Sequence, residues 1–290
     1  MIDARPLDLS PAGLERSAAL LRASMPRATH MTAAFLHWQY VENLAGAAIG
    51  LEAFDGERAV SHCVVQPLRA LLRGREVTGV MSMNAATLPS HLGRGIYFGL
   101  AEQVYAMARE AGHSFGVAVT NDQSTPGFLR RCGFRLVRPL DARLGMGSLP
   151  RPRSGVAVDF AKTWDDETIA WRLSPPHVRY RFETSGDRAR VFAASGMAGI
   201  DVELGEVPGR LVPGSAPRRG MATNPFRLWV GHDDRLDWKG KLFWNLPLQL
   251  RPSPLNLIFT DLADLADLPA SGIEGDGLSV SWSGLDFDDF

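Results

Sequence analysis

A glycine-rich turn between an apolar run and a helical pattern is the feature of the sequence best suited to chemistry. The run, residues 77–88, is long enough for a strand, and the turn after it reads Pro89-Ser90-His91-Leu92-Gly93-Arg94-Gly95. Beyond the turn, apolar residues recur at every fourth position, as on one face of an amphipathic helix: Ile96, Leu100, Val104 and Ala108. A strand that leads through such a turn into a helix points several unpaired backbone N–H groups one way. With the helix dipole, these groups predict a seat for phosphate.

The residue types in the turn suit an anion. Gly93 and Gly95 carry no Cβ atom, so the oxygens of a ligand could approach the backbone closely, and Arg94 adds a full positive charge. The glycines also fit a plain strand-to-helix turn in which they only ease the geometry. The turn by itself leaves both interpretations open.

A second polar segment follows the next apolar run. Residues 114–120 predict a short buried strand, and the chain then reads Asn121-Asp122-Gln123-Ser124-Thr125-Pro126-Gly127-Phe128-Leu129-Arg130-Arg131-Cys132-Gly133-Phe134. A loop and a helix that a glycine ends would account for Gly133. They would not account for the spacing of Asn121, Ser124, Phe128 and Phe134.

In this order the two segments resemble the signatures of the GNAT acetyltransferases. Pro89-x-x-Leu92-Gly93-Arg94-Gly95-Ile96 is similar to the loop that binds the pyrophosphate of acetyl-CoA, and Asn121 to Phe134 is similar to the segment that contacts the pantetheine arm. Leu92 stands where the family usually has Arg or Gln, and Tyr97 stands where it usually has a small residue. The chain is identified on these motifs as a divergent member of the superfamily.

The resemblance implies acetyl-CoA as cosubstrate and a set of residues that hold it. Backbone N–H groups at the splayed end of the strand would face the acetyl carbonyl, and the glycine turn would hold the pyrophosphate. The predicted set is Ala86, Thr87, Leu88, Gly93, Arg94, Gly95, Ile96, Tyr97, Asn121, Ser124 and Phe128. No metal is expected.

Acid–base groups are harder to assign. A free amine is mostly protonated at neutral pH, so a base normally helps acetyl transfer. Residues 77–88 contain no Asp or Glu, where the family often places one, and the nearest candidates are His91, Asp122 and Glu42. Phe128 stands where many members have a tyrosine as general acid, which leaves Ser124 or a water for that role. We therefore name His91 and Ser124 as weak catalytic candidates.

The surrounding pattern predicts an α/β fold with a mixed sheet. Helices are expected from Ser10 to about residue 23 and over residues 33–43, with Ser10 and Thr32 as N-caps. Strands are expected at residues 48–54, 59–65, 68–72 and 77–88, and Asp55-Gly56 is a hairpin turn. This is the order of the GNAT fold. The second helix carries Phe35, Trp38, Tyr40 and Asn43, which favour a core and also resemble a segment of GNAT-like proteins from polysaccharide biosynthesis.

The length suits two units. We predict an acetyl-CoA-binding GNAT-like domain at residues 1–147, a proline-rich linker at 148–157 and a second, degenerate GNAT-like domain at 158–290. Trp38-Gln39-Tyr40 is echoed by Trp171-Arg172-Leu173, which suggests duplication, but the second unit has no Gly-x-Gly loop. The acidic end, Gly284 to Phe290, is expected to be solvated unless Phe287 and Phe290 dock in a groove.

Composition limits the partners. The net charge of −1 argues against nucleic acid and against an aminoacyl-tRNA-dependent transferase on the same fold. Cys63 and Cys132 fit a reducing compartment. The sequence has neither a signal peptide nor an apolar run long enough to span a bilayer, so a cytoplasmic protein without membrane contact is expected. A homodimer is compatible with all of these features.

The predicted function is an N-acetyltransferase that moves an acetyl group from acetyl-CoA to a primary amine of a small molecule or amino sugar. The alternative is a noncatalytic acyl-CoA-binding protein or partner subunit, which Phe128, Leu92 and the missing strand carboxylate favour.

Overall fold

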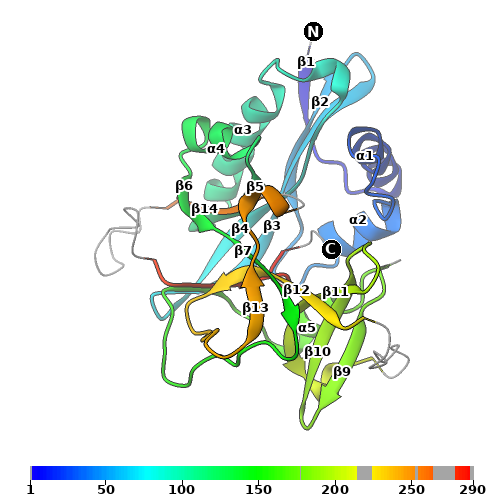
Figure 1. Ribbon diagram of the computed structural model, residues 1–290. Helices are drawn as coiled ribbons and strands as arrows, with labels where there is room; N and C mark the ends of the chain where they lie inside the picture. The colour runs from blue at the N-terminus through cyan, green and yellow to red at the C-terminus, as the bar shows by residue number, and fades with distance from the viewer. Residues whose placement is uncertain (1, 177, 214–223, 252–253, 264–277, 288–290) are drawn as a thin grey trace.

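The computed structural model describes residues 2–176, 178–213, 224–251, 254–263 and 278–287 (Figure 1). Its described strands form one mixed sheet of 15 strands with helices on both faces, which confirms the predicted α/β class. The first elements are β1 (Ile2–Pro6), α1 (Pro11–Ser24), α2 (Ala33–Tyr40), β2 (Ile49–Asp55), β3 (Arg58–Leu72), β4 (Arg75–Thr87), α3 (Ile96–Glu110), β5 (Phe115–Asn121), α4 (Thr125–Arg131) and β6 (Arg135–Pro139). There follow β7 (Asp141–Met146), β8 (Phe160–Lys162), α5 (Asp166–Arg172), β9 (Arg181–Ser185), β10 (Arg188–Ala194), β11 (Ile200–Pro208), β12 (Phe226–Asp233), β13 (Leu242–Asn245), β14 (Leu255–Asp261) and β15 (Val280–Ser283).

The first two helices begin where the sequence predicts. The Ser10 hydroxyl accepts a hydrogen bond from the Gly13 N–H at 3.2 Å, and the Thr32 hydroxyl accepts one from the Phe35 N–H at 3.2 Å. Helix α2 ends at Tyr40, three residues before the predicted end. The amide of Asn43 explains the difference, because its Nδ2 donates to the carbonyls of Gly46 and Pro67 and so stabilises a turn.

Strand β3 is continuous through Pro67, where the sequence predicts a break between two strands. β2 pairs with β3 only as far as Val65, and β8 pairs with it only from Ala70 onward. Pro67 lies between these two ladders, where β3 is paired to β4 alone. The N–H that proline lacks therefore interrupts neither neighbouring ladder.

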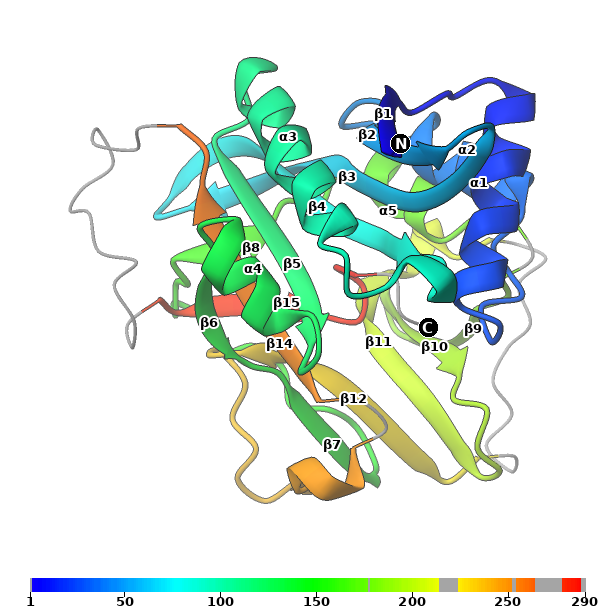
Figure 2. The ribbon, with the colours of Figure 1, turned by 90° about the horizontal axis from the view of Figure 1, so that it is seen from above.

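Strands β4 and β5 are parallel neighbours for a short distance and then separate. Their register runs from Gly79 opposite Phe115 to Ser82 opposite Ala118, after which β4 continues to Thr87 and β5 to Asn121. Figure 2 shows the two strands running apart below the N-terminal end of α3. We call the stretch in which β4 and β5 no longer pair with each other, residues 83–87 of β4 and 119–121 of β5, the divergence.

The second half of the chain repeats this arrangement. β9, β10 and β11 are antiparallel, and β12 lies parallel to β11 from Ile200 opposite Phe226 to Val202 opposite Leu228. Beyond this point β12 has another partner within the chain, because β15 pairs with its end, with Gly231 opposite Ser283. Leu285, two residues after the end of β15, lies close to β11, because a Cβ atom on Gly205 would be only 2.8 Å from its side chain.

The two halves exchange strands. β14 inserts between β5 and β6, with Leu257 opposite Val119 and Arg138, although it lies in the C-terminal part of the chain. β7 directly follows β6, yet it pairs with β12 and β13 of the second half. The boundary at residue 147 stays a prediction, and strands cross it in both directions.

A pair of tryptophans joins the two halves face to face. The rings of Trp38 on α2 and Trp171 on α5 stack with their centroids 4.8 Å apart. Each indole N–H donates to the backbone carbonyl of the other residue, at 3.1 and 3.2 Å. The Trp38 and Trp171 segments, which resemble each other in sequence, thus also contact each other reciprocally.

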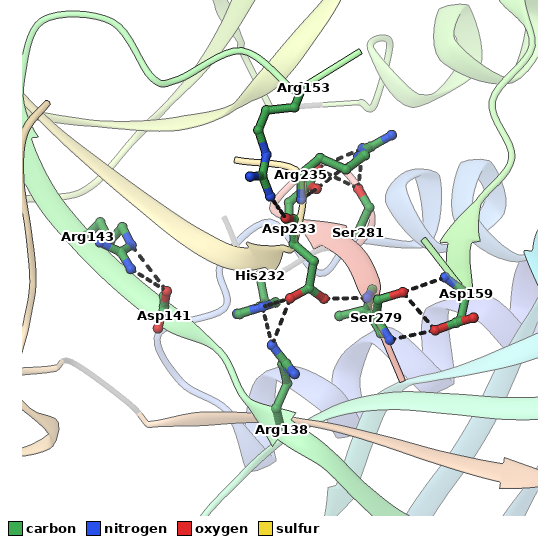
Figure 3. Close-up of polar contacts among 12 residues, drawn as sticks. Arg138, Asp141, Arg143, Arg153, Asp159, His232, Asp233, Arg235, Ser279 and Ser281 are labelled. Carbon is green, nitrogen blue, oxygen red and sulfur yellow. Dashed lines mark hydrogen bonds and ion pairs between the residues drawn. The ribbon is translucent and has the colours of Figure 1, made fainter. Parts of the chain in front are cut away.

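A polar network holds the last strand against β12 (Figure 3). Asp234 accepts a hydrogen bond from the Val280 N–H at 2.7 Å, and Asp159 accepts from the N–H and hydroxyl of Ser279 at 2.9 and 2.7 Å. Burial opposes the charge of Asp234, but the Val280 N–H and His232 outweigh it, so the pKa of Asp234 lies below its usual range. Arg138 of β6 contacts His232, which ties this network to the first half.

Two further predictions concern the organisation of the chain. Residues 148–157 contain no described helix or strand, only an isolated bridge from Pro152 to Leu236, and their role as a linker stays a prediction. Of the two alternatives for the C-terminal end, solvated or docked, the structure shows the second for Phe287, which is buried. Its carbonyl accepts from the Arg172 guanidinium at 3.3 Å, which draws the end of the chain onto α5. Phe290 lies outside the described residues.

Replacing Trp171 tests the reciprocal contact. Trp171→Phe keeps a ring but removes the indole N–H, so we expect the free energy of unfolding to fall by about 1 kcal/mol. Trp171→Ala also removes the stack and should cost about 3 kcal/mol. Urea unfolding measures both changes when it is followed by the circular dichroism of the backbone, which does not depend on the replaced tryptophan. Because the two bonds are reciprocal, Trp38→Phe should be coupled to Trp171→Phe, and strictly additive effects would contradict the contact.

A shortened chain tests the strand exchange. Residues 1–147 alone lack β14, which leaves β5 and β6 without their shared neighbour, so we expect no cooperative unfolding transition. Asn256 pairs with Pro139, so a chain in which a short glycine linker joins residue 139 to residues 254–263 restores β14 as a hairpin partner of β6. This matched chain should unfold cooperatively. Equal cooperativity of both chains in urea would show that β14 is dispensable.

Candidate active site

The glycine turn lies at the N-terminus of α3. A short 3-10 turn at Pro89–His91 leads to Gly93 with φ 74° and to Gly95 with φ 71°, which is the N-cap. Both values lie in the left-handed region that glycine adopts without strain. A Cβ atom on Gly93 would meet nothing within 4 Å, so this side of the turn faces open space. The first N–H groups of α3, from Ile96 onward, have no partner within the helix.

Two arginines lie at this turn. Arg94 is exposed, and its guanidinium donates to the Ser90 carbonyl at 3.1 Å within the turn. Arg131 of α4 pairs with Glu102 of α3 at 2.9 Å, and its Nη1 lies 3.5 Å from the Gly95 carbonyl. The sequence pointed to Arg94 only. Arg131 reaches the turn because α4 packs beside α3, a tertiary contact that the motif spacing does not report.

Tyr97 fits at a position where the family usually has a small residue because its side chain turns inward. Its hydroxyl lies 3.5 Å from that of Ser82 on β4, and its ring contacts those of Phe98 and Phe128. Burial raises the pKa of Tyr97 well above its usual value. The ring therefore packs under the turn, while Leu92 is 62% exposed on it.

The end of β4 carries a bulge within the divergence. His62 of β3 is opposite Ala86, and Val64 is opposite Met83. Cys63 is therefore opposite two residues, Asn84 and Ala85, which form the bulge. Asn84 has a φ of 50°. Beyond the bulge, the Leu88 N–H donates to the Val60 carbonyl at 2.8 Å. Backbone N–H groups alternate in direction along an antiparallel strand. The N–H of Ala86 therefore also points to β3, and the N–H of Thr87 points away from β3, toward the divergence. Of the three predicted carbonyl-binding positions, Thr87 has the suitable direction.

The second motif forms a compact turn at the end of β5. The Oδ1 of Asn121 accepts hydrogen bonds from the Gln123 N–H and the Ser124 N–H, at 3.1 and 3.0 Å, and from the Ser124 hydroxyl at 3.0 Å. Ser124 is the N-cap of α4. Phe128 is 2% exposed and packs edge-on against Phe98, so it belongs to the core. Asn121 and Ser124 thus lie together, and Phe128 points inward.

The predicted bases are held elsewhere. His91 is buried, with its Nδ1 2.8 Å from the Ser90 hydroxyl and its Nε2 3.3 Å from Asp55 at the end of β2. Glu42 pairs with His37 at 3.0 Å on the exposed end of α2. Both nitrogens of the His91 ring therefore have partners, and the structure does not bring His91 beside Ser124.

A buried polar chain ends at the divergence, and no motif of the sequence predicts it. Glu52, His62 and Tyr40 are each fully buried, and the Tyr40 hydroxyl reaches Asn84 of the bulge at 2.8 Å. The residues come from β2, β3, α2 and β4, so no motif joins them. The only local signal is that Glu52 and His62 interrupt apolar strands. The assignments of individual residues to ligand or catalysis stay predictions.

Among the described residues, no group of three or more His, Cys, Asp or Glu side chains is placed to hold a metal ion. No helix in the described part of the chain is long and apolar enough to cross a membrane.

Comparison with known proteins agrees with this geometry. The family model of the acetyltransferase (GNAT) domain matches residues 8–137, which span α1 to β6 and both motifs. No curated protein matches the sequence.

Solved structures resemble most of the chain at low identity. A probable N-acyltransferase from Enterococcus faecalis has a TM-score of 0.59 and 10% identity, over 90% of this chain and 73% of that one. A GCN5-related N-acetyltransferase from Kribbella flavida has a TM-score of 0.55 and 13% identity, over 89% of this chain and 71% of that one. Saccharomyces cerevisiae N-myristoyltransferase with bound myristoyl-CoA has a TM-score of 0.56 and 9% identity, over 89% of this chain and 82% of that one. At these identities the likeness shows the fold alone, over most of the chain. The family match is confined to the first half, and residues 8–137 are therefore a GNAT acetyltransferase domain.

Proposed function

We propose that the protein transfers an acetyl group from acetyl-CoA to a primary amine of a small molecule or amino sugar. The observation that carries the proposal is the glycine turn at the N-terminus of α3, with Gly93 and Gly95 both at positive φ beside the divergence of β4 and β5. The turn offers N–H donors and the divergence offers backbone groups that no neighbouring ladder uses. A long ligand with a pyrophosphate at one end and a thioester at the other suits both.

The pyrophosphate would bind the first N–H groups of α3, where the helix dipole favours negative charge. Arg94 and Arg131 lie at the turn and would add positive charge. The thioester would then lie at the end of β4, with its carbonyl oxygen accepting from the Thr87 N–H. Such a donor stabilises the negative charge that develops on that oxygen during attack.

The reaction forms one bond and breaks another. The amine nitrogen attacks the carbonyl carbon, the C–S bond breaks, and CoA leaves as a thiolate that takes up a proton as the amine loses one. Ser124, half-buried at the N-terminus of α4, or a water molecule would return the proton to sulfur. Holding the amine against the thioester contributes to the rate by itself.

A noncatalytic acyl-CoA-binding protein or partner subunit is the second candidate. Phe128, where many relatives have an acid, is buried in the core and has no proton to donate. His91 is held by Asp55 and Ser90. The second half of the chain is proposed not to bind acetyl-CoA, because β15 pairs along the strand that diverges there. A cytoplasmic location and a homodimer remain part of the proposal.

Thiol release tests the function directly. We expect CoA to be released from acetyl-CoA only when an amine is present, and Ellman's reagent measures it. The amines to compare are glucosamine, spermidine, an aminoglycoside and amino acids. Burial raises the pKa of Cys63 to about 12 and that of Cys132 to about 11, so the protein's own thiols will contribute little colour at pH 8. Binding of acetyl-CoA without release by any amine would favour the noncatalytic candidate.

Replacing a glycine of the turn tests the cosubstrate site. Gly93→Leu places a side chain in the open space where the pyrophosphate would bind, so we expect acetyl-CoA affinity to fall at least about tenfold. Gly74→Leu is the matched control, because Gly74 has φ 78° and equally open surroundings in the distant β3–β4 hairpin. The control carries the same backbone strain and should bind normally in calorimetry. Equal affinity of both variants would remove the turn from the site.

A further inference from the structure

The polar chain that runs from the core to the divergence has a fixed direction. The Nδ2 of Asn84 donates to Gln39 Oε1 at 2.5 Å and to the Tyr40 hydroxyl at 2.8 Å, which uses both of its hydrogens. Since the Tyr40 oxygen accepts from Asn84, its own hydrogen points to the Nε2 of His62, 3.1 Å away.

The other end of the chain is a carboxylate. His62 accepts at Nε2, so its ring proton lies on Nδ1, which faces Glu52 Oε1 at 3.0 Å. The same oxygen accepts from the Ser17 hydroxyl at 2.8 Å, and Arg16 lies 3.4 Å from the other oxygen. Burial opposes the charge of Glu52, but His62, Ser17 and Arg16 outweigh it and lower its pKa. The hydrogens of Tyr40 and His62, and one of the two on Asn84 Nδ2, therefore point along the chain toward Glu52.

The backbone conformation of Asn84 suits an asparagine. Its φ of 50° is left-handed, a region in which asparagine is the most tolerant residue after glycine. The bulge turns its side chain to the face of the sheet that α2 covers, because the partners Gln39 and Tyr40 lie on α2. Neighbouring residues of a strand point to opposite faces of the sheet. Cys63, next to His62, interacts with Tyr97 of α3, so α2 and α3 lie on opposite faces. Figure 1 shows α1 and α2 on one side of the strands, and α3 and α4 on the other.

The amide of Asn84 is thus held so that only its oxygen is available to a ligand. Glu52, His62 and Tyr40 are each 0% exposed, whereas Asn84 is half-buried and lies two residues beyond the last β4–β5 pair, Ser82 and Ala118. Among the described residues, no hydrogen bond to Oδ1 of Asn84 is formed. A carbonyl oxygen there accepts hydrogen and carries no net charge.

We propose that Asn84 is a positioning residue for the acceptor, whose side-chain carbonyl accepts a hydrogen from the attacking amine while Gln39 and Tyr40 keep the amide in that orientation. This inference rests on the proposed function and adds the group that receives the acceptor. A neutral carbonyl orients an N–H without stabilising the ammonium form as a carboxylate would, so the lone pair on nitrogen stays free to attack. The acceptor it suits is a primary amine, which offers one hydrogen to Asn84 and loses another.

Replacing Asn84 by glycine tests the inference cleanly. Asn84→Gly permits the left-handed backbone and removes the amide, so the bulge should persist. With the amine that the wild-type protein acetylates fastest, we expect kcat/KM for the amine to fall about tenfold or more, mainly through KM, because an oriented hydrogen bond is lost. The dissociation constant of acetyl-CoA, measured by calorimetry, should change less than about twofold. Tyr40→Phe, which frees the amide to rotate, should shift the amine KM in the same direction.

Arg73→Gly is the matched control, because Arg73 has the same φ of 50° in the remote β3–β4 hairpin. It should leave both constants as in the wild type. An unchanged amine kcat/KM in Asn84→Gly would overturn the inference while the proposed function stands. An equal loss of acetyl-CoA affinity would also overturn it, since Asn84 would then serve the cosubstrate. If the wild-type protein releases no CoA with any amine, the proposed function fails, and the inference fails with it.

Discussion

The separation of two parallel strands is the constraint on which the rest of the structure depends. β4 and β5 pair over four positions and then part, which leaves backbone groups in the middle of a sheet without a neighbouring ladder. Such groups are costly to bury unless something pairs with them. In the second half of the chain, β15 pairs with the parting strand. In the first half, the glycine turn, the N-terminus of α3 and the bulge of Asn84 all adjoin the divergence, which is the site we propose for the thioester of the cosubstrate.

The exchange of β7 and β14 interlocks the two halves of the sheet. β14 completes the sheet beside β5, so the strand that borders the divergence is held by residues from the far end of the chain. The stacked tryptophans and the network around Asp234 join the halves at two further places. The second half of the chain thus supplies strands and packing to the first.

The buried chain from Glu52 to Asn84 shows how the core reaches the site. A buried carboxylate is destabilising unless it is fully paired, and Ser17, His62 and Arg16 pair this one. The same bonds fix the tautomer of His62, the rotor of Tyr40 and the orientation of the Asn84 amide. Replacing Glu52 would therefore alter the divergence through three side chains, although Glu52 itself lies within the core.

The sequence by itself determined the parts that local pattern controls. The caps at Ser10 and Thr32, the amphipathic α3 and the glycine turn follow from residue spacing, and so does the family, since both motifs are contiguous segments. Only the tertiary structure decided which strands are neighbours, that Tyr97 and Phe128 point inward, and that Glu52, His62, Tyr40 and Asn84 form one chain. The physical reason is that hydrogen bonds between strands and burial in the core depend on segments far apart in sequence. Propensity, turn chemistry and periodicity act over a few residues and carry no record of those partners.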